Sequence, residues 1–284
     1  MQTRRDFLRL SPLIPGTLLF SLLPGQQAYG SQSFKNDVGI QLWTFRNELN
    51  SDLEGTLDAI ASLGYKTLEP YGFDGRFFGR DASDFYRICA DRGLTIYSTH
   101  TGITSENAPE YTEIAAKIGL EFLVLPSFMG RPDKTTDDFK KVADELNVIG
   151  EQCLRAGVRF AYHNHDFEFK NADGKLLYEI LLEKTDPALV SFQMDLYWVV
   201  KGGQDPFRLF HKFPGRFTTW HIKDISAEGR TAIVGNGKID FKNIMTKAAQ
   251  AGLEKLIVEQ EQYDEGSPAF CAGQSLKYIQ KHLL

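Results

Sequence analysis

The chain has 284 residues, 42% of them hydrophobic and 24% charged, which fits one globular unit with a large core and excludes a disordered or fibrous protein. The formal net charge is −5, and residues 1–30 carry Arg4, Arg5, Arg9 and Asp6, a sum of +2, so the rest carries −5 − 2 = −7. Such an acidic surface disfavours nucleic acid and anionic membranes as partners.

Residues 1–30 have the composition of an export signal. A basic start precedes an apolar run over residues 10–23, and Ala28-Tyr29-Gly30 forms a small-x-small cleavage site. Proline and glycine interrupt the run, which is too short to span a membrane well. The segment TRRDFLR at residues 3–9 resembles the twin-arginine signal. We therefore expect export to the periplasm and a mature domain of residues 31–284 without membrane contact; an ordinary signal peptide is the alternative.

Strand-like and helix-like stretches alternate after the signal. Strands are expected at residues 38–43, 66–72, 95–100, 122–127, 158–165, 190–195, 217–224 and 255–261. Amphipathic helices are expected at 53–63, 81–92, 108–118, 136–156, 174–184, 206–213, 241–251 and 267–282. A glycine follows five of these helices directly, in the position where a left-handed backbone ends a helix: Gly64, Gly93, Gly119, Gly157 and Gly252.

This repeated strand–helix unit predicts an α/β fold with a parallel sheet. Eight units within one domain predict a (β/α)8 TIM barrel. A doubly wound open sheet is the alternative, but the Gly-x-Gly-x-x-Gly turn typical of one class of such sheets does not follow the first strand.

In a parallel barrel the carboxyl ends of all strands open on one face, so residues far apart in the sequence converge there. Asp195, His221 and Glu259, together with His163 or His165, form a mixed nitrogen and oxygen ligand set that suits Mn²⁺, Co²⁺, Fe²⁺ or Zn²⁺. Strand alternation puts both of these histidines on the same face and therefore does not choose between them.

Several motifs are similar to those of a known superfamily. They are GIQLW at residues 39–43, YHNHDFEF at 162–169, MDLYW at 194–198, WHIKD at 220–224, VGNGKIDF at 234–241 and IVEQE at 257–261. The chain resembles the xylose isomerase-like barrel superfamily, in its sugar phosphate isomerase/epimerase group, over residues 38–282. That group includes ketose 3-epimerases, inosose dehydratases and 3-keto-glycoside lyases.

The resemblance implies a divalent metal bound by one ligand from each of the fifth to eighth strands, matched here by His163 or His165, then Asp195, His221 and Glu259. Two positions depart from the pattern. The epimerases carry a glutamate where this chain has His163-Asn164-His165, and Trp198 replaces a substrate-binding histidine. Proton exchange between two carboxylates is therefore not carried over, and lyase or dehydratase chemistry stays open.

We predict an exported, metal-dependent isomerase/epimerase-type enzyme acting on a sugar, keto-sugar or cyclic polyol through an enediolate. Glu259 or His165 would be the base, and Lys223 would lie near the developing oxyanion unless it only pairs with Asp224 or Glu259. The predicted substrate contacts are Glu69, His100, Trp43 and Trp198. The alternatives are a metal-dependent lyase or dehydratase acting on 3-keto-glycosides or inosose, and a non-catalytic sugar-binding barrel.

Overall fold

The computed structural model describes residues 37–128 and 135–284. The predicted export signal at residues 1–30 lies outside the described residues. Across the described ranges, no helix has the length and apolar character needed to cross a membrane.

All eight predicted strands are present, and they pair in parallel. The third is divided at Tyr97 into two segments, β5 and β6. The bounds are β1 Val38–Gln41, β2 Thr67–Glu69, β5 Thr95–Ile96, β6 Ser98–His100, β7 Phe122–Leu125, β8 Arg159–His163, β11 Ser191–Asp195, β12 Thr219–Ile222 and β15 Lys255–Val258.

The division of the third strand explains how the barrel closes. The strand order is β5-β2-β1-β15-β12-β11-β8-β7-β6, so the two ends of the sheet are segments of the same strand. The backbone at Tyr97 joins both sides, because its N–H donates to Leu68 and its carbonyl accepts from Phe122. The predicted (β/α)8 TIM barrel is thus confirmed, with one bent strand at the seam.

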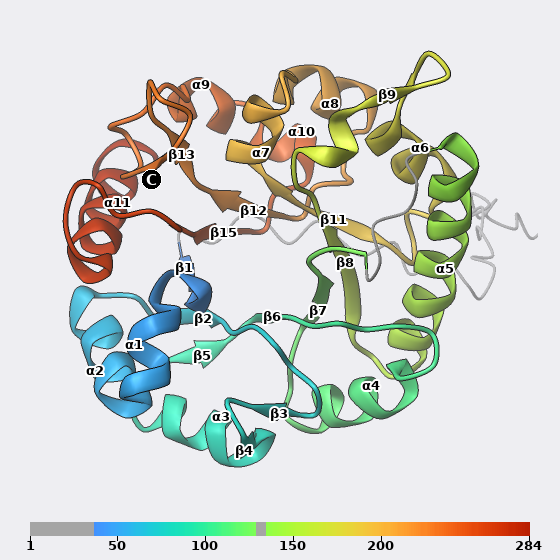
Figure 1. The fold of residues 1–284 in the computed structure, drawn as a ribbon. Coiled ribbons are helices and arrows are strands. Elements are labelled where there is room, and N and C mark those ends of the chain that lie inside the picture. The colour runs from blue at the N-terminus through green and yellow to red at the C-terminus, as the bar shows by residue number, and fades with distance from the viewer. Residues whose placement is uncertain (1–36, 129–134) are drawn as a thin grey trace, which may run out of the picture. The chain divides into compact units, whose positions relative to one another are not determined.

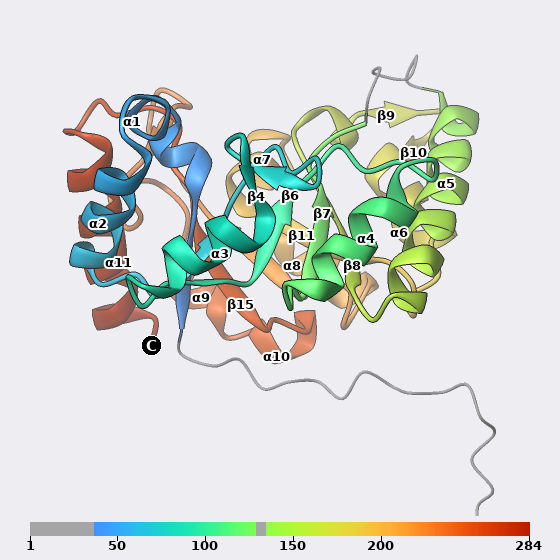
Figure 2. The same ribbon diagram turned by 90° about the horizontal axis from the view of Figure 1, so that it is seen from below.

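Helices surround the strands (Figure 1). They are α1 Arg46–Ser51, α2 Leu53–Leu63, α3 Ala82–Ala90, α4 Ala108–Lys117, α5 Thr136–Arg155, α6 Leu177–Lys184, α7 Leu196–Lys201, α8 Pro206–Lys212, α9 Phe241–Met245, α10 Ala248–Ala251 and α11 Pro268–His282, with short 3-10 helices at Leu42–Phe45 and Phe167–Phe169. In the side view, α1 and β9 lie at the end where strands finish, and α10 lies at the opposite end (Figure 2).

The five glycines expected after helices all have positive φ, from 66° to 102°. A side chain at these positions would be strained, which is why glycine ends these helices. Three differences from the predicted elements are local. The first strand ends at Gln41 because its side chain accepts the Trp43 N–H and caps a 3-10 helix. The helix expected from residue 174 begins only at Leu177, and the helix expected over 241–251 is divided into α9 and α10.

Three small antiparallel hairpins follow the carboxyl ends of strands and form part of the loops on that side of the barrel. They are β3 Arg76–Phe77 with β4 Arg80–Asp81, β9 Asn171–Ala172 with β10 Lys175–Leu176, and β13 Asp224–Ile225 with β14 Thr231–Ala232. The main core packs outward-facing strand residues against the helices, whereas Phe122, Val124 and Ala161 form a separate cluster with Tyr97. The predicted site residues therefore lie at the end of the barrel that these hairpins surround.

Candidate active site

Four neighbouring strands carry the predicted metal ligands. His163 ends β8, Asp195 ends β11, His221 lies in β12, and Glu259 directly follows β15. These strands pair in the order β8, β11, β12, β15, and Asp195 lies opposite His221 in the register. The parallel register thus brings the four side chains to the same end of the barrel, where all four are buried.

Asp195, His221 and Glu259 form one possible metal-binding group, with ligand atoms within 4.8 Å of one another. His221 Nδ1 lies 3.2 Å from Glu259 Oε2 and 4.0 Å from Asp195 Oδ2. Asp195 Oδ1 accepts the Trp198 N–H and caps α7, but Oδ2 is buried and has no hydrogen-bond partner among the described residues. Burial raises the pKa of Asp195 to about 6 although Lys223 and His221 favour its charged form. A buried carboxylate oxygen that accepts no hydrogen bond, beside an imidazole and a second carboxylate, fits a divalent transition-metal ion.

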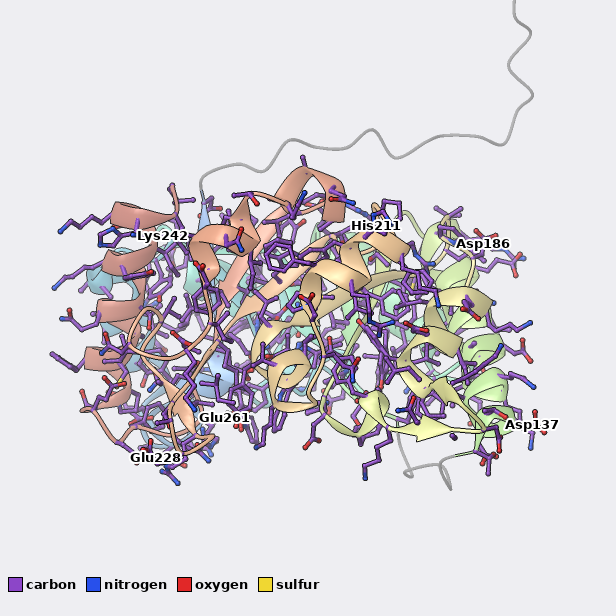
Figure 3. The ribbon with its side chains drawn as sticks, turned by 90° about the horizontal axis from the view of Figure 1, so that it is seen from above. Asp137, Asp186, His211, Glu228, Lys242 and Glu261 are labelled. Carbon is purple, nitrogen blue, oxygen red and sulfur yellow. The ribbon has the colours of Figure 1, made fainter. Side chains whose placement is uncertain are left out.

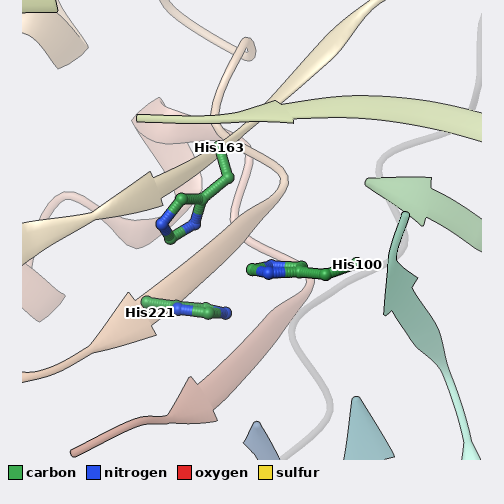
Figure 4. Close-up of side chains that lie close together, drawn as sticks. All are labelled: His100, His163 and His221. Atoms are coloured by element: carbon green, nitrogen blue, oxygen red, sulfur yellow. The ribbon is translucent and has the colours of Figure 1, made fainter. Parts of the chain in front are cut away.

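His100, His163 and His221 form a second group of ligand atoms, sharing His221 with the first (Figure 4). Gln193 Oε1 lies 2.7 Å from His100 Nε2 and 2.9 Å from His163 Nδ1, so this one amide oxygen orients both rings. His163 Nε2 is left 3.9 Å from Asp195 Oδ2. Burial, followed by the charges of the neighbouring histidines, holds the pKa of His163 well below its usual range, so the ring is neutral and able to bind a metal.

The geometry distinguishes the two histidines that the sequence leaves equivalent. His163 lies within the histidine cluster, whereas His165 follows the end of β8 and belongs to neither group of ligand atoms. The His165 ring packs between Phe167 and Trp198, and its Nδ1 is buried without a hydrogen-bond partner in the described part of the chain. Burial and the Lys223 charge lower the pKa of His165 to about 4. The geometry therefore favours His163 over His165 as a ligand.

Glu69 lies beneath this cluster and is fully buried. It accepts hydrogen bonds from Ser98, from Gln41 at 2.9 Å and from Gln193 at 2.7 Å, and its Oε1 lies 2.6 Å from His221 Nε2. Burial alone would raise the pKa of Glu69, but His100 and His221 hold it well below its usual range. Glu69 does not line the cavity, so this geometry lends no support to its predicted role as a substrate contact.

Lys223 is also fully buried and lies among carboxylates. Its Nζ is 3.1 Å from Glu259 Oε2 and 3.5 Å from Asp195 Oδ2, and it donates to Glu261. Burial opposes its charge, yet these carboxylates raise its pKa above the ordinary value. Of the two simple pairings considered for Lys223, the one with Glu259 is present, whereas Asp224 accepts four backbone N–H groups instead.

A cavity of about 460 Å³ opens above the cluster. It is lined by Trp43, Tyr71, Gly72, His100, Thr101, Gly102, Pro126, His163, His165, Trp198, Glu259 and Glu261. Trp43 is 41% exposed and packs edge-on against Tyr71, while Trp198 packs against His165. Asp195, His221 and Lys223 are not among the lining residues. In Figure 3, Glu261 and Glu228 lie at one end of the barrel, whereas His211 and Lys242 lie at the opposite end.

Sequence reasoning missed Gln41, Ser98 and Gln193 as members of the site. Gln193 lies two residues before Asp195 on the same face of β11, so strand alternation could have indicated it. Ser98 carries the same signal, because it lies two residues before His100 in β6. Gln41 carries no comparable signal, because its role depends on Glu69 in the neighbouring strand β2.

Comparison with known proteins identifies the family. The profile of the xylose isomerase-like TIM barrel family matches residues 57–282, and the chain belongs to this family. This confirms the resemblance inferred from the motifs.

Individual relatives carry different names within this fold. A sugar phosphate isomerase/epimerase from Parabacteroides distasonis ATCC 8503 is 32% identical, with a TM-score of 0.77, and the match covers 91% of this chain and 98% of that one. The inosose dehydratase of Bacillus anthracis is 27% identical over 177 residues, which span 55% of this chain and 59% of the relative. The IOLI protein with a bound zinc atom shares the fold, with a TM-score of 0.69 at 14% identity over 87% of this chain and 99% of that one.

Proposed function

We propose that this protein is an isomerase/epimerase-type enzyme for a sugar, keto-sugar or cyclic polyol, and that it removes a proton from the carbon next to a carbonyl group in the carbonyl form of that substrate. The observation that supports this most is Asp195 Oδ2, which accepts no hydrogen bond from the described residues and faces His221 and Glu259 beneath a cavity that His165 lines. The name of the Parabacteroides relative points to the same class of reaction.

Asp195, His221 and Glu259 would hold the metal, with His163 as the candidate fourth ligand. When bound, a divalent cation such as Mn²⁺, Co²⁺, Fe²⁺ or Zn²⁺ supplies a Lewis acid that polarises the substrate carbonyl. Glu69 Oε1 accepts a hydrogen bond from His221 Nε2, and this orients the ring so that Nδ1 faces Asp195 and Glu259. The solved structure of the IOLI protein, which shares this fold, contains a bound zinc atom.

His165 is the better supported of the two candidate bases. Its imidazole is neutral at neutral pH and lines the cavity, so the ring can accept a proton from a substrate bound there. Glu259 Oε2 already contacts His221 and Lys223, which lower the pKa of Glu259 despite its burial. A carboxylate with these partners is a poor proton acceptor and a good ligand.

The remaining predicted residues either line the cavity or lie behind its wall. Trp43 and Trp198 line the cavity with aromatic surface, which suits the C–H face of a sugar ring, and His100 adds a polar ring nitrogen. Lys223 lies behind this wall and contacts Glu259 and Glu261. We propose that its positive charge acts through these carboxylates and keeps them ionised.

A dehydratase is the second candidate, because the alignment with inosose dehydratase favours it. Removal of the same proton would then be followed by loss of a hydroxyl group from the adjacent carbon. The residues that hold the carbonyl and accept the proton would be the same, and the products would differ.

A deuterium-exchange assay tests the proposal. The purified protein, loaded with Mn²⁺, Co²⁺ or Zn²⁺, is incubated in D₂O with free ketoses, 3-keto-glucosides and inososes, and the products are analysed by mass spectrometry. We expect deuterium at the carbon next to the carbonyl of at least one compound. Loss of water or of an aglycone would instead identify the lyase or dehydratase reaction.

Two variants and one control make this assay specific. Asp195→Asn and His165→Gln should each abolish most of the exchange, whereas His211→Gln should not, because His211 lies at the far end of the barrel (Figure 3). If the metal-loaded wild type binds a sugar from the panel but exchanges no proton in any of them, the protein is a sugar-binding barrel.

We also propose that the protein is exported to the periplasm, on the basis of residues 1–30 alone. Cell fractionation of the wild type and of a variant with Arg4→Lys and Arg5→Lys tests this. Retention of the variant in the cytoplasm supports the twin-arginine route, and unchanged export supports an ordinary signal.

A further inference from the structure

Glu168 is a buried carboxyl group that the proposed chemistry does not use. It lies in the 3-10 turn Phe167–Phe169, just after the His163-Asn164-His165 segment, and its side chain is inaccessible to solvent. Its Oε1 accepts a hydrogen bond of 2.5 Å from the Tyr162 hydroxyl, and its Oε2 accepts one of 2.9 Å from the backbone N–H of His165. Neither partner is a cation, and burial raises the pKa of Glu168 to about 7.

The side chain of His165 has few constraints of its own. Its Nδ1 has no hydrogen-bond partner among the described residues, so ring packing holds the imidazole. The ring stacks on Phe167 with a centroid distance of 6.0 Å and contacts Trp198 at 5.4 Å. The backbone of His165 lies outside strand β8, and its N–H is bound by the Glu168 carboxyl group.

Tyr162 fixes Glu168 in turn. Tyr162 is fully buried on β8 and stacks on Phe128 at 4.8 Å, so its hydroxyl group has a defined position. A chain of contacts therefore runs from the rigid strand through Tyr162 and Glu168 to the peptide that carries His165.

We propose that Glu168 is a positioning residue, which holds the peptide of His165 so that the imidazole stays directed into the cavity. This inference rests on the proposed function, in which His165 accepts the substrate proton. Glu168 itself does not line the cavity, so it would act through His165 and not on the substrate directly.

The first test measures the position of His165 without any substrate. Exchange of the imidazole C2 hydrogen with D₂O, followed by mass spectrometry of peptides, reports the accessibility of each histidine separately. In Glu168→Met, which has a similar length but no acceptor, the exchange rate of His165 should rise toward that of the exposed His282. In Glu168→Gln, whose amide oxygen can still accept the His165 N–H, the rate should stay as in the wild type.

Asp166→Asn is the matched control, because Asp166 lies in the same turn but is exposed and makes no capping hydrogen bond. Circular dichroism shows whether each variant folds. If Glu168→Met does not fold, Tyr162→Phe removes only the second partner of the carboxyl group and should raise the His165 exchange rate by a smaller factor. Unchanged His165 exchange in every folded variant of Glu168 and Tyr162 would overturn the proposal.

The second test measures turnover with any compound that the wild type exchanges in the D₂O assay. Glu168→Met should lower kcat by roughly 10- to 100-fold, the range expected when a catalytic group moves by about an ångström. Glu168→Gln should restore it, and adding Glu168→Met to His165→Gln should cause no further loss. An equal loss in both backgrounds would show that Glu168 does not act through His165. If the wild type exchanges no compound, the proposed function fails, while the histidine-exchange result still decides whether Glu168 positions His165.

Discussion

At the scale of single residues, the ionisable groups of the site differ in the kind of partner that balances their burial. Glu168 accepts hydrogen bonds from two uncharged donors, the Tyr162 hydroxyl and the His165 N–H, whereas Glu259 contacts His221 and Lys223. Burial therefore raises the pKa of Glu168 to about 7, while the cations lower that of Glu259. The two carboxyl groups make opposite contributions to the pH dependence of stability.

Because of Glu168, we expect the free energy of unfolding to fall as the pH rises. Its folded pKa of about 7 exceeds the ordinary value of 4.5, so the folded state binds the proton more tightly than the unfolded state. Its contribution is complete below pH 4.5 and is lost as the pH rises through 7. Glu168→Gln lacks this dependence and should gain up to roughly 3 kcal/mol relative to the wild type across this interval. Urea unfolding at several pH values measures the difference, and parallel curves for the two proteins would refute the assignment.

We expect the stability of the protein to depend strongly on the positive charge of Lys223. In Lys223→Met, three carboxylates lose their shared cation, and removing one partner of a buried ion pair costs about 3–5 kcal/mol. We also expect a larger rise in Tm on adding Mn²⁺ than in the wild type, because the metal then supplies the missing charge. Thermal unfolding with and without Mn²⁺ checks both effects.

Lys255→Met is the control for Lys223→Met. Lys255 is also buried and pairs with Asp37 at 2.7 Å, but it begins β15, at the opposite end of that strand from Glu259. The Lys255→Met variant should be less stable than the wild type, but its Tm should rise on adding Mn²⁺ by the same amount as that of the wild type. An equal response in the two variants would mean that the charge of Lys223 is unrelated to the metal site.

At the scale of elements, the sequence predicted the strands well because two independent signals agree. Apolar runs identify the strands, and glycines such as Gly64 and Gly157 mark where the preceding helices end. Short helices directly after strands were not predicted. The helix α7, for example, begins at Leu196 because Asp195 caps it, and its residues LYWVVK continue the apolar character of β11. A hydrophobic run does not by itself show where the backbone changes from strand to helix.

The same limit applies to the site. The rule that parallel strands end on one face identified the ligands that converge, since that depends only on topology. It could not decide between His163 and His165, because both follow the same alternation, and it could not show that Gln193 orients the rings of His100 and His163. Those contacts depend on side-chain conformation and on which strands are neighbours.

The loop between β12 and α9 gives a prediction at this scale. Asp224 accepts backbone N–H groups from Ile225, Gly235, Gly237 and Ile239 at 2.8–3.1 Å. Asp224→Ala should therefore loosen residues 225–239, and amide hydrogen exchange should increase there more than elsewhere. Gly237→Ala should have a similar effect, because the added Cβ would lie 2.2 Å from Asp224 Oδ1. Unchanged exchange in this loop in both variants would show that other contacts hold it.

At the scale of the whole molecule, the barrel brings together groups from all parts of the chain. The candidate ligands lie on four neighbouring strands, and Glu69, on β2, reaches His221 across the barrel interior. An ion bound by Asp195 and Glu259 contacts two segments that are more than 60 residues apart in the sequence. If His163 also binds the ion, the separation is larger. Binding therefore links several strands that must all be folded for the site to exist.

This linkage predicts that metal stabilises the entire fold. A ligand that binds only the folded state adds about 2.7 kcal/mol at 100 times its Kd. For a domain of this size that corresponds to a rise in Tm of roughly 5 to 10 °C. Protein stripped with a chelator should thus melt at a lower temperature than protein reloaded with Mn²⁺ or Zn²⁺, as measured by scanning calorimetry. Asp195→Asn, which weakens a candidate ligand at the centre of the site, should lose most of this difference. If stripped and reloaded wild-type protein melt at the same temperature, Asp195, His221 and Glu259 do not hold a tightly bound ion.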